Sequence, residues 1–414
     1  FDLMARPTIR TANDLRTAFS SFFAEKAHTI VPSASLIPHD PTVLFTVAGM
    51  VPFKPYFTGD EAAPFARAVS VQKCARAGGK HNDLDDVGRT KRHLVFFEML
   101  GNFSFGDYFK SDAIPWSWEL ITEVFGFDGD RIWITVHESD DEAEQIWHDV
   151  VGVPMNRIQR LGDADNFWQM GETGPCGPCS ELHIDRGPAF GPDGGPLNDP
   201  HGDRFMEIWN LVFMQFNQAA DGSRTALPKP SIDTGAGLER ILTLIQGKDA
   251  VWETDLIQPL LDHASSLTGK HYRVGDYDDR DSFALRVLAE HARSGAMLIN
   301  DGVFPSNEHR GYVLRRILRR AIRFAYLLGA DKLVMPSLVD TAVTLMGEAY
   351  PDVLKNRDFI AKVVTREEEA FRRTLKNGLA ILDKELADGV DTLSGATAFM
   401  LHDTFGFPLE VTTE

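Results

Sequence analysis

Cysteine is scarce in this sequence, and long apolar runs are missing from it. Only Cys74, Cys176 and Cys179 occur among 414 residues. They are too few to build a disulfide framework in a chain of this length, which favours a reducing, cytoplasmic location. No apolar stretch approaches the ~20 residues that a membrane-spanning helix needs, and the beginning of the sequence lacks the order of a secretory signal. We therefore expect no membrane partner.

Positive charge is scarce as well. The chain has 42 lysines and arginines against 60 aspartates and glutamates, a formal net charge of −18. This balance argues against an overall affinity for nucleic acid, although it leaves room for a local basic surface. Hydrophobic residues make up 43% of the chain, which is ample for buried cores and excludes disorder for most of it.

The predicted elements change in kind near residue 250. Before it, short β-type runs such as 43–50, 93–100 and 207–216 alternate with helical stretches, which indicates an α+β fold. Beyond it, strand signals almost vanish and apolar residues recur at helical spacing. We expect two domains, residues 1–250 and an all-α domain at 251–414.

One amide stands on an otherwise apolar strand face. Alternation along residues 206–217 places Asn210 and Val212 on one face, and Glu207 on the other with Trp209. A buried amide without a hydrogen-bond partner is costly, so Asn210 must bond either to protein or to a ligand. Glu207 could hold a metal or simply meet solvent.

An acid, two glycines and an amphipathic helix follow one another from Asp233 onward. The glycines let the backbone approach a ligand closely, and a helix N-terminus favours anions. A phosphate could therefore bind here, with Arg240 as its counter-charge. The alternative is that Asp233 serves only as an N-cap.

Cations gather in the polar loop before the run at 93–100, among them Arg76, Lys80 and Arg92. Arginine forks and lysine point charges suit a polyphosphate. Phe96 and Phe97 could stack on a base. A solvated loop over a core strand is the alternative reading, because nearby aspartates partly cancel the charge.

Cys176 and Cys179 form a CxxC pair, with His183 shortly after it. A tetrahedral zinc site needs four ligands, and only Cys74, distant in sequence, remains as a further thiol. We expect a rigid, proline-rich turn that shapes a pocket, and no structural zinc, although redox or metal chemistry stays open.

A run of arginines marks the predicted helix at residues 312–328. Between His309 and Ala330 there are six arginines and no acid. A charge run is usually a solvated face, but such a face normally mixes signs. Arginine alone in an acidic protein favours a phosphate-backbone partner, and Asn307, just before the helix, could reach a base edge.

Together these stretches closely resemble the alanyl-tRNA synthetases, a family of class II aminoacyl-tRNA synthetases. The three class II motifs are matched by residues 22–50, by 72–88 with 92–109, and by 231–241. Blocks particular to the family are matched by residues 165–181, 207–217 and 301–323. The resemblance implies an antiparallel sheet flanked by helices, then an all-α tRNA-recognition domain, with the family's editing and C-terminal domains absent from this chain.

The same resemblance implies an activity. The family activates L-alanine with ATP and Mg²⁺ to alanyl-adenylate, transfers it to tRNA(Ala) and reads the G3·U70 pair of the acceptor stem. We expect a monomer. A catalytically silent RNA-binding paralogue and an amino acid:carrier protein ligase of the same fold are the alternatives, with a zinc protein built on the CxxC pair as the weakest.

The resemblance also assigns roles to residues. The catalytic set is Arg76, Arg240 and Asp233. The ATP contacts are Arg76, Lys80, His81, Phe96, Phe97, Glu98 and Arg240. The alanine contacts are Asp233, Asn210, Val212, Trp168, Gly235 and Met50. The tRNA contacts are Asn307, Arg315, Arg316, Arg319 and Asp403, and Glu207 is the Mg²⁺ ligand. Val47, Glu290 and His309 depart from the family pattern, which usually has Asn, Asp, and Gly or Asn at these positions.

Overall fold

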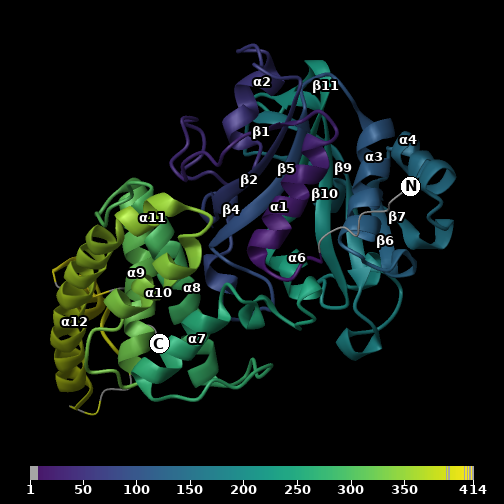
Figure 1. Cartoon of the computed structure of the whole chain (residues 1–414). Coiled ribbons are helices and arrows are strands. Elements are labelled where there is room, and N and C mark those ends of the chain that lie inside the picture. The colour runs from purple at the N-terminus through teal and green to yellow at the C-terminus, as the bar shows by residue number, and fades with distance from the viewer. Residues whose placement is uncertain are drawn as a thin grey trace. The chain divides into compact units, whose positions relative to one another are not determined.

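The computed structural model describes residues 8–387, 389, 392–404, 406, 407, 409 and 412. It divides into two compact units, Phe1–Gln258 and Pro259–Glu414 (Figure 1). No described helix is both long and apolar enough to cross a membrane.

A mixed, mainly antiparallel sheet forms the first unit. Its strands follow the spatial order β1 (Thr29–Ile30), β2 (Arg67–Ala75), β5 (Phe96–Ser104), β11 (Arg224–Gly237), β10 (Phe205–Gln218), β9 (Gly174–Asp185), β6 (Ile132–His137) and β7 (Ile158–Leu161), with β8 (Phe167–Gln169) beside β9. Only the β1–β2 and β6–β7 pairs are parallel among these described strands. A small hairpin of β3 (Ala77–Gly78) and β4 (His81–Asn82) extends from the end of β2.

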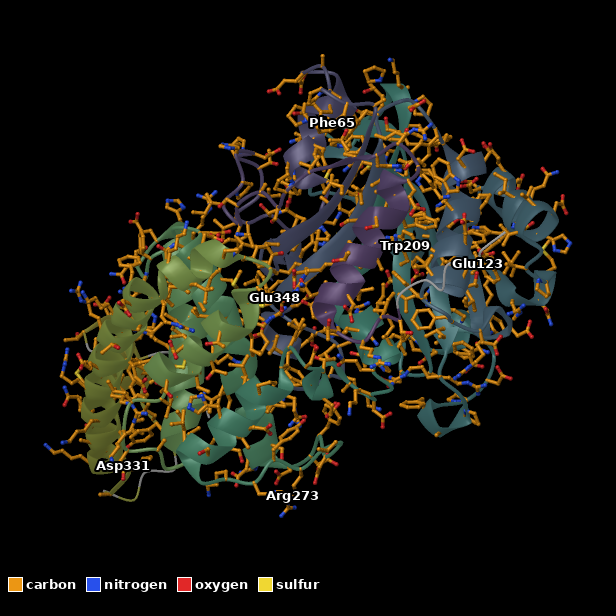
Figure 2. The ribbon with its side chains drawn as sticks, viewed as in Figure 1. Phe65, Glu123, Trp209, Arg273, Asp331 and Glu348 are labelled. Carbon is orange, nitrogen blue, oxygen red and sulfur yellow. The ribbon has the colours of Figure 1, made fainter. Side chains whose placement is uncertain are left out.

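Helices flank this sheet, as Figure 1 shows for α1. They are α1 (Ala12–Ala24), α2 (Lys54–Thr58), α3 (Lys110–Glu119), α4 (Asp141–Gln145), α5 (Asp163–Asn166) and α6 (Leu238–Ile245). A capping box of Thr11 and Asp14 begins α1. Its buried Phe19 and Phe23 pack against Trp209 of β10, at ring distances of 5.8 and 6.3 Å. Figure 2 labels Trp209 beside α1. The expected antiparallel sheet flanked by helices is therefore confirmed.

Helices and the loops between them form the second unit, and its described residues include no strand. The helices are α8 (Arg280–Asn300), α9 (His309–Leu327), α10 (Met335–Met346), α11 (Pro351–Lys355), α12 (Arg357–Ala387) and α13 (Gly395–Asp403), while α7 (Gln258–Thr268) begins at the boundary of the units. The apolar stripe of α9, including Leu314, Ile317 and Leu318, is fully buried, because it packs on α8 and α12. An all-α region after the sheet is thus confirmed.

Two expectations about strand geometry are wrong. The register of β10 against β9 shifts between Glu207 and Trp209, so a β-bulge interrupts the alternation. Because of this bulge Glu207 lies on the same side as Asn210, not with Trp209. The CxxC stretch is not a turn but part of β9, where a side chain on Gly177 would come within 1.9 Å of the Phe213 carbonyl oxygen.

Candidate active site

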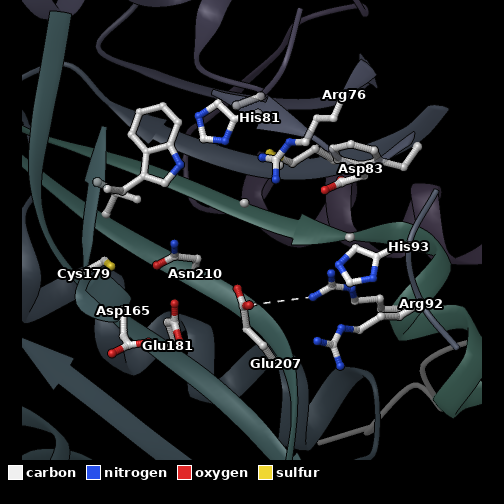
Figure 3. A pocket seen from close by; sticks show the side chains of 18 of the residues that line it. Arg76, His81, Asp83, Arg92, His93, Asp165, Cys179, Glu181, Glu207 and Asn210 are labelled. Carbon is white, nitrogen blue, oxygen red and sulfur yellow. Dashed lines mark ion pairs between the residues drawn. The ribbon is translucent and has the colours of Figure 1, made fainter. Parts of the chain in front are cut away.

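A pocket of about 370 Å³ opens over the face of the sheet that carries Asn210. Its walls come from β5, β9, β10 and β11, from the β3–β4 hairpin and from the segment around β8. Figure 3 shows Glu181, Glu207 and the Asn210 amide on one side of this cavity and Arg76, Arg92 and His93 on the other, with Asp83 beside Arg76. Eleven of the predicted site residues line it: Arg76, Lys80, His81, Phe97, Trp168, Glu207, Asn210, Val212, Asp233, Gly235 and Arg240.

Strand pairing fixes the positions of the predicted alanine contacts. Val212 pairs directly with Asp233 of β11, and Asn210 pairs with Gly235. On the other side of β10, Val212 pairs with Cys179. Neighbouring strands lie about 4.8 Å apart, so these side chains form a continuous floor.

Asp233 is the most unusual group of this floor. Asp233 is only 5% exposed. In the described part of the chain, no hydrogen bond or ion pair reaches its carboxylate, and burial alone raises its pKa to about 8. The N-cap alternative does not hold, because Gly237 and not Asp233 precedes α6.

The amide of Asn210 is also incompletely satisfied. Its Oδ1 atom is buried and has no hydrogen-bond partner in the described protein. This observation favours the ligand interpretation over a satisfied core amide, because a native core rarely leaves such an atom unpaired. Trp168 closes the pocket nearby and stacks on His81 at a ring distance of 6.3 Å. Burial lowers the pKa of His81 to about 4, so that ring is neutral at physiological pH.

Three arginines form the basic side of the pocket. Arg76 lies over the Phe97 ring at 5.2 Å, and Arg240 forms a 3.7 Å ion pair with Glu207, drawn as a dashed line in Figure 3. Burial and the charge of Arg240 lower the pKa of Arg92. Like charges crowded in this way are stabilised by an anion.

The pocket does not include every predicted contact. Phe96 and Glu98 are fully buried outside the pocket, since alternation along β5 turns Phe97 to the pocket and its neighbours away from it. Met50 does not line the pocket either, and it is fully buried in the apolar cluster that includes Val212 and Cys179. Glu98 pairs with Arg16 of α1 at 2.6 Å. The roles assigned to these three residues stay predictions.

The Val47 departure does not remove the contact that holds Arg76. The Nε atom of Arg76 donates to the backbone carbonyl oxygen of Val47, at 2.9 Å. A backbone acceptor is present whatever the side chain is. Val47 itself packs in the apolar cluster below the pocket.

Glu181 is a pocket residue that the sequence interpretation missed. It accepts hydrogen bonds from His183 Nε2 at 3.0 Å and from Thr135 at 3.4 Å, and burial together with the charge of Glu207 raises its pKa. The only feature of the sequence that could have indicated Glu181 as a pocket residue is its position two residues after Cys179. Arg92, one of the cations predicted to suit a polyphosphate, also lines the pocket, as do Cys179 and Asp165, which had no predicted role there. In the described residues, no three His, Cys, Asp or Glu side chains are grouped to hold a metal.

The arginines of α9 are not all alike. Arg315 and Arg319 both pair with Glu367 of α12, at 3.0 and 2.9 Å. Arg315 also donates to Asn307 Oδ1 at 2.5 Å, while Arg316 lies exposed. The acid that neutralises this face was missed, because it lies some 50 positions later in the sequence.

Asp403 is exposed at the last position of α13. His309, the first residue of α9, has a φ of 52°, a left-handed conformation that Gly and Asn adopt most easily. The family preference for Gly or Asn at this position therefore has a backbone cause. Glu290 reaches His291 Nδ1 at 2.5 Å inside the unit.

Comparison with known proteins agrees with this geometry. The family model for class II (A) tRNA synthetases matches residues 14–414. Curated alanine–tRNA ligases of Chromohalobacter salexigens, Oleidesulfovibrio alaskensis and Xanthomonas axonopodis pv. citri are 55%, 52% and 51% identical to the chain over 97%, 98% and 99% of it. The matches cover 46%, 46% and 47% of those relatives, so the chain spans about half of their length. The chain belongs to the class II tRNA synthetase family.

Proposed function

We propose that this chain activates L-alanine with ATP and transfers it to tRNA(Ala), reading the G3·U70 pair. The observation that carries this proposal is Asp233: a buried carboxylate with no cation beside it among the described residues, in a pocket that Arg76, Arg92 and Arg240 also line. The α-ammonium group of an amino acid would be a positively charged partner for the Asp233 carboxylate. The negative charges of a triphosphate would pair with the arginines. The relatives' printed name, alanine–tRNA ligase, selects the amino acid.

The first step is a displacement at phosphorus. An alanine carboxylate oxygen forms a bond to the α-phosphorus of ATP, and the bond to the pyrophosphate oxygen breaks. Asp233 pairs with the ammonium group, and the Asn210 amide contacts the bound amino acid. Arg76 and Arg240 stabilise negative charge on the phosphates. Catalysis then comes from positioning and charge stabilisation, without a protein nucleophile. We assign the adenine contact to Phe97, because its ring lines the pocket beside Arg76.

Mg²⁺ fits this pocket only together with the nucleotide. Glu207 and Glu181 offer carboxylate oxygens close enough for the charge of Glu207 to raise the pKa of Glu181. Mg²⁺ is usually held by one or two carboxylates plus substrate phosphates, so these two residues would hold it, and it would neutralise phosphate charge. The ion pair between Glu207 and Arg240 would then have to open.

The second step transfers the alanyl group. A terminal ribose hydroxyl of the tRNA attacks the alanyl carbonyl carbon, and AMP leaves. In the helical unit, Asn307 and Asp403 carry the polar groups proposed to read G3·U70, and Arg316 is the exposed cation for the backbone. Asn307 is oriented by its bond from Arg315, which Glu367 fixes in turn.

The silent paralogue and the carrier-protein ligase are not favoured. Asp233, Arg76 and Arg240 line one pocket, which RNA binding alone does not require. The curated relatives are named as tRNA ligases. A monomeric state and a cytoplasmic location remain part of the proposal.

Alanine-dependent exchange of pyrophosphate into ATP tests the first step. The chain should catalyse it, and Asp233→Asn should lower kcat/KM for alanine by about a hundredfold or more, since a buried charge pair is lost. Asp221→Asn, the same change in the exposed loop between β10 and β11, should leave it unchanged. Absence of exchange with every amino acid would contradict the proposal. Equal charging of G3·U70 and G3·C70 acceptor stems would contradict its tRNA part.

A further inference from the structure

Three directly paired strands place Cys179 in line with Asp233. Val212 of β10 pairs with Asp233 on one side and with Cys179 on the other, so the three residues form a row across the sheet. With about 4.8 Å between strands, Cys179 lies two strand spacings from Asp233. Figure 3 shows the Cys179 thiol turned toward Asn210, which stands in the next row. The row therefore begins at the carboxylate and ends at a thiol, with an apolar side chain between them.

Cys179 is held firmly at that position. It is 1% exposed and packs in the apolar cluster that includes Met50, Met170 and Val212. Its backbone carbonyl accepts a hydrogen bond from Asn166 Nδ2, at 3.0 Å. A side chain in the middle of a sheet that is packed at interior density moves little when a larger ligand enters the pocket.

The thiol gives the pocket wall its shape. It packs among the apolar side chains of that cluster, and its polar neighbour is the Asn210 amide. A buried free thiol behaves as a small hydrophobic group. It is suited to contact a methyl group and not to act as a nucleophile or a metal ligand.

We infer that Cys179 sets the depth of the amino-acid pocket and so determines the size of the side chain that is activated. With the ammonium at Asp233 and the carboxylate directed toward the arginines, the amino-acid side chain lies over Val212 and points to Cys179. The inference rests on the proposed alanine activation and adds to it the residue that excludes the next larger homologue, L-2-aminobutyrate. No covalent step involves this cysteine.

The chain supplies its own matched control. Cys176 is equally buried, lies on the same strand three residues earlier and does not line the pocket. Cys176→Ala therefore repeats the chemical change of Cys179→Ala outside the site. A general loss of packing in β9 would affect both variants, whereas a change in pocket depth would appear only in Cys179→Ala.

Pyrophosphate exchange with glycine, L-alanine and L-2-aminobutyrate tests the inference. Cys179→Ala should shift the ratio of kcat/KM values toward L-2-aminobutyrate over alanine by about tenfold, the usual effect of one methylene group. Cys179→Val should shift it toward glycine over alanine by a similar factor, because it shortens the pocket. Cys176→Ala should leave both ratios at the parent values. Thermal unfolding of each variant checks that it is folded.

The outcomes separate this inference from the function on which it rests. If the parent chain activates alanine and both Cys179 variants keep the parent ratios, Cys179 does not set the depth and the inference is overturned, while alanine activation stands. If only one variant folds, the shift in its own ratio decides. If the parent activates no amino acid, the proposed function falls and the inference falls with it.

Discussion

At the scale of single residues, the charge state of Asp233 links the pocket to the stability of the fold. Its pKa is about 8 in the folded protein and 3.8 in an ordinary environment. Between these values the folded chain holds a proton that the unfolded chain has released. The contribution of Asp233 to the free energy of unfolding therefore falls as the pH rises through this window, by about 1.4 kcal/mol per pH unit near its centre. An ammonium ligand would counter this loss by pairing with the carboxylate.

Asp233→Asn should remove this dependence, because an amide does not titrate. Measured by urea unfolding at pH 5, 6 and 7, the stability of the variant relative to the parent should increase steadily with pH. Asp221→Asn, which alters an exposed turn, should follow the parent. Parallel pH profiles for Asp233→Asn and the parent would show that Asp233 is ionised in the folded chain.

The sequence indicated which side chains gather at the pocket, but not their electrostatic state. An amide on an apolar strand face and an acid before two glycines were visible as patterns, and the structure brings Asn210 and Asp233 into one floor. Whether each group has a hydrogen-bond or charge partner depends on the side chains that the neighbouring strands contribute. The spacing of residues within one strand does not predict this. The pocket position of Glu181 could not be predicted for the same reason, because the residues around it come from β6 and β10.

At the scale of elements, strands were predictable and their irregularities were not. Alternation along residues 206–217 correctly predicted β10. It failed for Glu207, because a bulge depends on how two strands pair and not on the residues of one strand. The proline-rich stretch predicts a turn, because proline is rare inside strands, yet it pairs in β9.

The pairing of α9 with α12 gives a second testable feature. Glu367 is 6% exposed and accepts from both Arg315 and Arg319. Glu367→Gln removes the charge between two arginines, so it should destabilise the helical unit by roughly 3 kcal/mol, the usual cost of breaking a buried ion pair. Thermal unfolding should show a lower midpoint. It should also weaken the preference for G3·U70, because Arg315 orients Asn307.

Glu369→Gln is the matched control. Glu369 lies on the exposed face of the same helix, two residues further on. Its change should leave the unfolding midpoint and the base-pair preference at the parent values. An equal and small effect of both variants would mean that the α9–α12 ion pairs contribute little.

At the scale of the whole molecule, the net charge of −18 hides a separation of charges. Arg76, Arg92 and Arg240 meet in one pocket, and the arginines of α9 lie within the helical unit. The shift from strand-rich to helical sequence near residue 250 was visible from periodicity alone. Which arginines face solvent was not, because the neutralising Glu367 comes from another helix.

Arg316 provides the test at this scale. Binding of an acceptor-stem duplex carrying G3·U70 should weaken with salt, and Arg316→Gln should lower the slope of log K against log salt by about one. The loss should be similar for other duplex sequences, since a phosphate contact reads no base. Arg366→Gln, the same change at an exposed position of α12, should preserve the slope. An unchanged slope in Arg316→Gln would count against an RNA contact at this residue.

The bulge in β10 also affects how this stretch should be compared across relatives. One extra residue lies between Glu207 and Trp209 in the pairing with β9. A sequence alignment scored on hydrophobic similarity could therefore contain a one-residue gap here without a lower score. Such a gap would nevertheless assign the carboxylate to a neighbouring position of the strand. Aligning relatives on the paired positions Asn210 and Gly235, and counting back from them, keeps the acidic position in frame.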